Sequence, residues 1–171
     1  MTERSDILNN QAILFASDGD YSSAIACFKR AIIIDNQNYL LWYNLGVTYR
    51  DNGDYENARH ALEKAFNMNP ENYEVLETLA TICLMEKRYD DTLFYCMLGL
   101  DLDECTEHFL NLAGVVYFQQ EDYETASSYF ESAVSINPYY KDALLNLKDT
   151  YYELGNKFGI EEVNKKLSSC R

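Results

Sequence analysis

A repeat of 34 residues runs through this chain of 171 residues and constrains its fold more than any other feature. Two columns keep this step, a small column and a tyrosine column: Ala12, Gly46, Ala80, Gly114; Tyr21, Tyr55, Tyr89, Tyr123. A fixed period of this length indicates one supersecondary unit stacked several times, each unit burying its apolar face against its neighbours. Rows of 34 residues give repeats at 5–38, 39–72, 73–106 and 107–140, then a partial repeat and cap over 141–171.

Each repeat contains two apolar segments with helical spacing. In the second repeat they are LLWYNLGVTYRDN and ENARHALEKAFNM, on either side of Gly53-Asp54-Tyr55. An acidic residue near the start of each second segment fits helix N-capping and the helix dipole. The sequence therefore predicts an all-α chain of four helix pairs plus one further helix, closed by a helix over 158–169.

The small residues predict how the helices pack. Glycine inside a helix costs about 1 kcal/mol relative to alanine, so Gly46 and Gly114 indicate close contact between helices. We expect their column to face a second small column, and a third to receive the next repeat: Ala24, Ala58, Thr92, Ala126; Ala31, Ala65, Gly99, Ala133. The last repeat breaks these columns with Lys148, Ile160 and Leu167, which predicts a C-terminal cap without the same close crossing.

Composition excludes several classes of function. The net charge is −14, whereas nucleic acids and anionic membranes select clustered Lys and Arg. The first residues lack the basic and apolar regions of a secretory signal, and no uncharged apolar stretch reaches the length of a membrane span. Five cysteines without C-x-x-C spacing indicate reduced thiols. We therefore expect a cytoplasmic protein with no membrane insertion and no nucleic-acid partner.

The columns resemble the tetratricopeptide repeat, W-x2-L-G-x2-Y…A-x3-F…A…P. The second repeat matches this motif most fully: Trp42, Leu45, Gly46, Tyr49, Ala58, Leu62 (for Phe), Ala65, Pro70. The third matches least, with Cys83, Thr92, Cys96 and Gly99. The resemblance covers essentially the whole chain and implies one domain over 1–171, a right-handed α-superhelical solenoid of antiparallel helix pairs. First helices would line a concave groove, and second helices the convex side.

The resemblance does not extend to the carboxylate clamp of Hsp70/Hsp90 co-chaperones. That site uses Lys, Asn and Arg, whereas its columns here hold other residues: Asn9, Ile13, Asn44, Glu74, Thr78. Only Asn44 is retained, and Glu74 reverses a required charge. We therefore expect no clamp-type binding.

The groove positions of the first helices predict a surface for another protein. Asn10, Asn44 and Asn146 share one column, and an amide both donates to and accepts from an extended peptide backbone. Some superhelical members of the family use such an asparagine ladder; alternatively, these residues only solvate exposed helices. Neighbouring positions add polar and apolar side chains, an exposed apolar floor that indicates a partner: Ile13, Tyr43, Val47, Glu77, Thr81, Asn111, Val115, Phe118.

Charge is unevenly distributed along the chain. Between Tyr89 and Tyr140 there is no Lys or Arg, although ten acids occur. Asp101, Asp103 and Glu107 predict an acidic flank that steers a basic partner. The alternative is that most of the acids serve helix starts and loops.

No catalytic or metal-binding set is visible. His60 and His108 lie in different repeats, and neither has a Ser or Cys neighbour at helical spacing. We expect a non-enzymatic scaffold or adaptor, without cofactor or metal, that binds a peptide segment in its groove. Two other roles stay open, a holding chaperone for a secretion substrate and a regulatory subunit of an enzyme.

Overall fold

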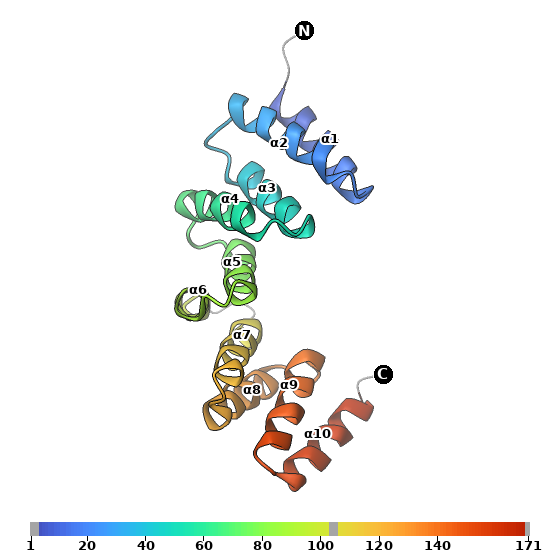
Figure 1. Cartoon of the computed structure of the whole chain (residues 1–171), viewed down its shortest axis with the longest axis vertical. Helices are drawn as coiled ribbons and strands as arrows, with labels where there is room; N and C mark the ends of the chain where they lie inside the picture. The colour runs from blue at the N-terminus through green and yellow to red at the C-terminus, as the bar shows by residue number, and fades with distance from the viewer. Residues whose placement is uncertain (1–3, 103–105, 170–171) are drawn as a thin grey trace. The chain divides into compact units, whose positions relative to one another are not determined.

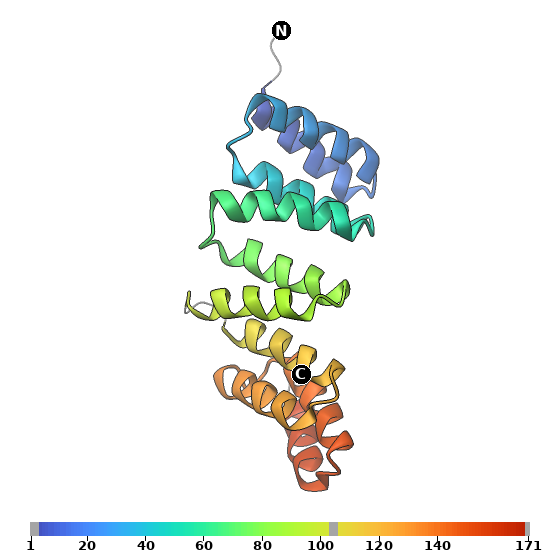
Figure 2. The same ribbon diagram turned by 60° about the vertical axis from the view of Figure 1, so that its left-hand side comes forward.

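The computed structural model describes residues 4–102 and 106–169, and within these residues it contains ten α-helices and no strand (Figure 1). The helices are α1 (Ser5–Ser17), α2 (Tyr21–Ile34), α3 (Tyr39–Asp51), α4 (Tyr55–Met68), α5 (Tyr73–Met85), α6 (Tyr89–Leu100), α7 (Thr106–Gln119), α8 (Tyr123–Ile136), α9 (Lys141–Glu153) and α10 (Lys157–Ser169). The predicted all-α array of helix pairs is confirmed. Paired helices such as α1 and α2 lie side by side (Figure 2).

The chain divides into two compact units. Unit 1 is Met1–Glu86 and contains α1 to α5, and unit 2 is Lys87–Arg171 and contains α6 to α10. The division falls inside the repeat over 73–106, where the sequence matches the motif least. The single domain over 1–171 and the right-handed superhelix stay predictions.

Four of the second helices begin at the tyrosine column because the preceding residue caps them. The side chains of Asp20, Asp54 and Asp122 accept the backbone N–H three residues later, at 3.1, 3.2 and 3.1 Å. Each bond satisfies an otherwise unpaired donor of the first turn. At the start of α6, Arg88 occupies this position and makes no capping bond.

The residue before this cap has a left-handed backbone in every repeat. Gly19 and Gly53 have φ of 79° and Gly155 of 68°, a conformation without penalty for glycine. Lys87 and Glu121 adopt φ of 58° and 63° at the same position. The turn geometry is therefore kept even where the sequence lacks glycine.

The small columns are buried where helices meet, as predicted. A Cβ on Gly46 would lie 2.5 Å from Leu62 Cγ and 3.2 Å from the carbonyl oxygen of Ala58, so α3 and α4 approach closely at this glycine. A Cβ on Gly99 would overlap the ring of Phe109, the first-helix residue that it receives from the next repeat. The alanines of all three columns are fully buried: Ala12, Ala24, Ala31, Ala58, Ala65, Ala80, Ala126, Ala133.

Helix α10 closes the core of unit 2. Its Val163 is buried in one cluster with Val134, Leu144 and Leu147. The expectation that the last repeat lacks a close crossing was wrong, because a Cβ on Gly159 would lie 2.6 Å from the ring of Tyr151. This glycine precedes the position of Ile160 by one residue, a shift that alignment in rows of 34 does not reveal.

Candidate functional site

The predicted groove residues of unit 1 come from α1, α3 and α5, and we call these positions the first-helix face. Ile13 is 46% exposed, although it is an isoleucine. Val47 and Thr81 occupy the same repeat position and are half-buried, as is Tyr43. Asn10 is exposed, and Glu77 is half-buried. This column is therefore accessible in each first helix of unit 1.

Two asparagine pairs join neighbouring first helices. Nδ2 of Asn44 donates to Oδ1 of Asn9 at 3.0 Å, linking α3 to α1. Nδ2 of Asn146 donates to Oδ1 of Asn111 at 2.9 Å, linking α9 to α7. Both pairs span 35 residues, so the asparagines interact across two adjacent columns instead of forming one column.

The threonines that follow these asparagines bind the same turn of helix. Thr48 Oγ1 donates to the carbonyl oxygen of Asn44, and Thr150 Oγ1 to that of Asn146, both at 2.7 Å. The motif Asn-x-x-x-Thr therefore recurs at equivalent positions of α3 and α9. In α5 the position between them is Thr78, which is buried and donates to the carbonyl of Glu74 instead.

In unit 2 the first-helix face comprises Asn111, Val115 and Phe118 on α7 and Asn146 on α9. Asn111 is only 7% exposed, so the expectation that its side chain is open to a partner was wrong. Its burial follows from its bond to Asn146. Phe118 is half-buried and packs edge-on against Tyr123, with ring centroids 5.3 Å apart. Val115 is half-buried.

The acidic flank is only partly open. Asp101 is exposed at the C-terminal end of α6, and Asp103 lies outside the described residues. Glu107 is half-buried and accepts a hydrogen bond from Nδ2 of Asn137 at 3.3 Å. Other acids of this stretch also have structural partners, since Asp122 caps α8 and Glu131 accepts the hydroxyl of Tyr151 at 2.9 Å. Burial, together with this bond, raises the pKa of Tyr151 to about 12.

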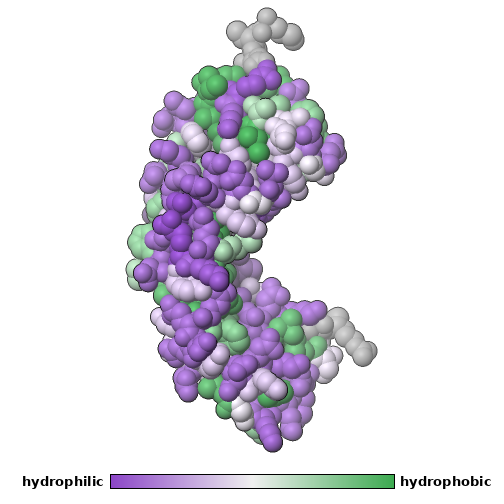
Figure 3. Space-filling model, in the orientation of Figure 1, coloured by the Kyte–Doolittle hydropathy of each residue, from purple (hydrophilic) through white to green (hydrophobic). Residues whose placement is uncertain are grey.

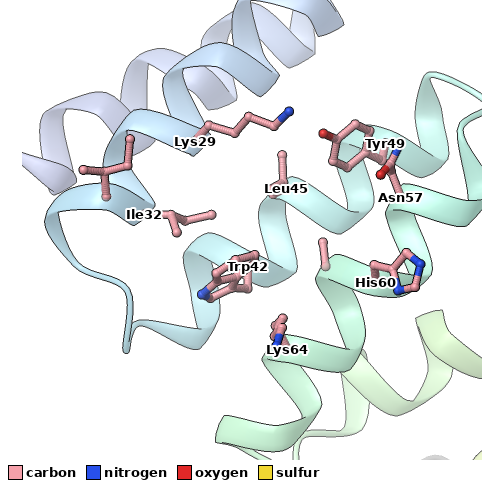
Figure 4. A pocket seen from close by; sticks show the side chains of 10 residues that line it. Lys29, Ile32, Trp42, Leu45, Tyr49, Asn57, His60 and Lys64 are labelled. Carbon is pink, nitrogen blue, oxygen red and sulfur yellow. The ribbon is translucent and has the colours of Figure 1, made fainter.

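A hollow that was not predicted from the sequence lies on the other side of α3, between α2 and α4. We call it the second-helix hollow of unit 1; its volume is about 420 Å³. Trp42, Leu45 and Tyr49 of α3 form its floor, and Lys29 reaches in from α2 (Figure 4). His60 and Lys64 of α4 complete the rim. The Lys29 Nζ lies 5.7 Å from the centre of the Tyr49 ring, a cation–π distance.

Unit 2 contains a hollow at the equivalent repeat positions, between α8, α9 and α10. Its volume is about 340 Å³, and we call it the second-helix hollow of unit 2. Comparing positions 102 residues apart, Glu131 replaces Lys29, Glu162 replaces His60, and Lys166 replaces Lys64. Reading the charged residues in these rows would have revealed the difference, but not the hollows themselves.

The structure also places the residues considered for chemistry. His60 Nδ1 lies 3.5 Å from a carboxylate oxygen of Glu63, and His108 stacks on Tyr140 with centroids 4.9 Å apart. Within residues 4–102 and 106–169, no group of three or more His, Cys, Asp or Glu side chains could hold a metal ion. In the same part of the chain, no helix is both long and apolar enough to cross a membrane.

Comparison with known proteins gives both sequence and structural relatives. Family models described as TPR repeat or tetratricopeptide repeat match 14–49, 39–72 and 117–157, together more than half of the chain. The match over 39–72 coincides with the predicted second repeat. No curated protein sequence matches the chain.

Solved structures share the fold. A MamA protein is 21% identical with a TM-score of 0.83, over 95% of this chain and 88% of that chain. PilF of Pseudomonas aeruginosa is 17% identical, with a TM-score of 0.83, over 98% and 76%. A tetratricopeptide repeat protein of Parabacteroides merdae is 23% identical, with a TM-score of 0.83, over 96% and 66%. At these identities the likeness shows the fold alone; with the three family models, it establishes that the chain belongs to the tetratricopeptide repeat family.

Proposed function

We propose that this chain is a non-enzymatic scaffold that binds a peptide segment of another protein on its first-helix face. Membership of the family supports a protein–protein interaction scaffold in general. The observation that carries the finer proposal is the column of Ile13, Val47, Thr81 and Val115. These side chains stay exposed or half-buried in four successive first helices, whereas the columns beside them are buried in the core. Apolar area kept accessible in this way favours a partner over solvent.

The asparagine pairs provide polar contacts beside this column. Asn44 is fixed by Asn9, and within the described residues its side chain makes no other hydrogen bond. Its carbonyl oxygen and second N–H therefore remain for a peptide backbone. Because the amide is already held in place, less side-chain entropy is lost when a peptide binds.

The acidic flank supports a basic partner. Asp101 is exposed in a stretch without Lys or Arg, and opposite charges accelerate association between proteins. We place the protein in the cytoplasm, a proposal supported by the buried thiols of Cys27, Cys83 and Cys96, which form no disulfide.

Binding kinetics with a partner isolated from the native organism test this proposal. Asn44→Ala should weaken the complex by about 1–3 kcal/mol, mainly through faster dissociation. Asp101→Lys should mainly slow association, and added salt should reduce the difference. Asn67→Ala, at an exposed position of α4, is the matched control and should bind as the parent does.

A partner whose affinity ignores Asn44→Ala, and which Val47→Glu does not weaken either, would contradict the proposal. The chaperone and regulatory roles need a partner-binding surface too. The identity of the isolated partner, an exported protein or an enzyme, decides between them.

A further inference from the structure

We propose that the second-helix hollow of unit 1 is a separate docking site for an acidic peptide segment that carries an aromatic or large apolar side chain. The hollow shares no residue with the first-helix face, so this site goes beyond the scaffold role above.

The floor of the hollow fits one apolar side chain. Leu45 and Ile32 are buried beneath it, and Trp42 lies half-buried at one end (Figure 4). The indole Nε1 of Trp42 donates to the carbonyl oxygen of Asn36 at 3.1 Å, which orients the ring. A volume of about 420 Å³ is within the range of small ligand sites.

Apolar surface continues past the rim of this hollow. Ile33, a lining residue on α2, is 83% exposed, which is unusual for an isoleucine. Hydrophobic side chains also appear among hydrophilic ones on the surface of the N-terminal helices (Figure 3). A peptide chain, longer than one side chain, would cover this additional area.

The rim of the hollow is cationic in a chain of net charge −14. Lys29 and Lys64 have no carboxylate partner among the described residues. Arg59, on the same helix as Lys64, is instead bound to Glu63 and Glu86, both at 2.9 Å. The two unpaired lysines therefore leave positive charge at the hollow, which an acidic partner would complement.

The fold itself does not require this charge. The second-helix hollow of unit 2 has the same position in the repeat and carries Glu131 and Glu162 where unit 1 has Lys29 and His60. Both hollows keep the tyrosine of the floor, Tyr49 or Tyr151, and Glu131 accepts the hydroxyl of the latter. The cationic rim is thus a property of the first hollow, and glutamate is compatible with the same packing.

Charge and shape together select the occupant. An aromatic side chain of the peptide would lie on Leu45 and Trp42, and carboxylates on either side of it would pair with Lys29 and Lys64. His60 adds positive charge when protonated. A basic peptide would be repelled by the same rim.

Fluorescence titration tests this site with a built-in reporter, since Trp42 is the single tryptophan of the chain. The probes are synthetic peptides acetyl-Asp-Glu-Phe-Asp-Glu-amide, the same peptide with Ala for Phe, and acetyl-Lys-Lys-Phe-Lys-Lys-amide. The first should change Trp42 emission in a saturable, salt-sensitive manner, and the other two should bind about tenfold or more weakly.

The double variant Lys29→Glu with His60→Glu copies the charges of the unit 2 hollow, so it should fold and lose affinity about tenfold or more. Lys141→Glu, an exposed charge reversal on α9, is the matched control and should bind like the parent. Far-ultraviolet circular dichroism of all variants verifies folding.

Several results would overturn the proposal: no response up to about 1 mM acidic peptide, equal binding of the basic peptide, or full affinity in the double variant. Asn44→Ala should leave peptide binding unchanged. A failure of this site is therefore distinguishable from a failure of the first-helix face.

Discussion

The side chain of Asn44 on α3 donates a hydrogen bond to that of Asn9 on α1 at 3.0 Å, and Asn146 on α9 does the same to Asn111 on α7 at 2.9 Å. These bonds connect first helices of consecutive repeats, which are otherwise separated in sequence by a second helix. The pairs fix the amides of the first-helix face before any partner binds.

This relationship predicts a coupling between Asn9 and Asn44 in the isolated protein. Each single alanine substitution should lower the free energy of unfolding by about 1 kcal/mol, and the double substitution by less than the sum, because the bond is lost only once. Urea unfolding of the four proteins measures the cycle. Asn10→Ala, at an exposed position of the same helix, should change stability by no more than about 0.5 kcal/mol. Additive effects of the two substitutions would contradict the coupling.

Gly46 should tolerate no large side chain. Gly46→Leu should destabilise the protein by about 1–3 kcal/mol or more, because a Cβ alone already meets Leu62. Urea unfolding midpoints give the comparison, with Asn67→Leu as the control for adding a leucine to an exposed helix position. Equal midpoints for Gly46→Leu and the parent would show that α3 and α4 do not cross closely here.

Glycine at position 121 should stabilise the protein. Glu121 has φ of 63°, where a side chain costs about 1 kcal/mol, and Gly19 and Gly53 occupy this position in other repeats. Glu121→Gly should therefore raise the thermal midpoint, measured by circular dichroism. Gln120→Gly, the neighbouring substitution, lacks this benefit and should lower it. A lower midpoint for Glu121→Gly would contradict the left-handed turn.

Tyr151 should make stability depend on pH in the alkaline range. Its pKa is raised from the ordinary value of 10.0 to about 12, by burial first and then by its bond to Glu131. The neutral phenol is favoured in the folded state, so its contribution is fully present below pH 10 and is lost as the pH rises toward about 12. Unfolding free energies from pH 9 upward should therefore fall more steeply for the parent than for Tyr151→Phe. Parallel pH profiles would contradict this prediction.

Removing α10 should expose the core of unit 2. Val163 of α10 packs with Val134 and Leu147, so a chain that ends at Gly155 leaves these side chains in water. We expect self-association or loss of solubility, measured by sedimentation velocity. A chain ending at Ser169 is the control. If the shorter chain stays a monomer of unchanged stability, α10 does not serve as a cap.

Much of this fold follows from sequence because the decisive signals are local and repeat. Asp54 before Tyr55 caps a helix through bonds within one turn, and Gly46 marks a crossing because no other residue fits there. Such constraints depend on backbone geometry that any chain shares, so a period of 34 residues and a few residue types were enough to predict the helices and the buried columns.

The candidate surfaces depended on tertiary structure. Asn44 pairs with Asn9, 35 residues away, because the side chains that meet between α1 and α3 are set by the rotation and tilt of two helices that are not adjacent in sequence. The same rotation buries Asn111. The second-helix hollow of unit 1 needs side chains from α2, α3 and α4 at once, and its volume depends on what those side chains leave unfilled. Sequence alone determined the repeat and its core; packing between helices decided which residues outside that core are buried and which remain open to a partner.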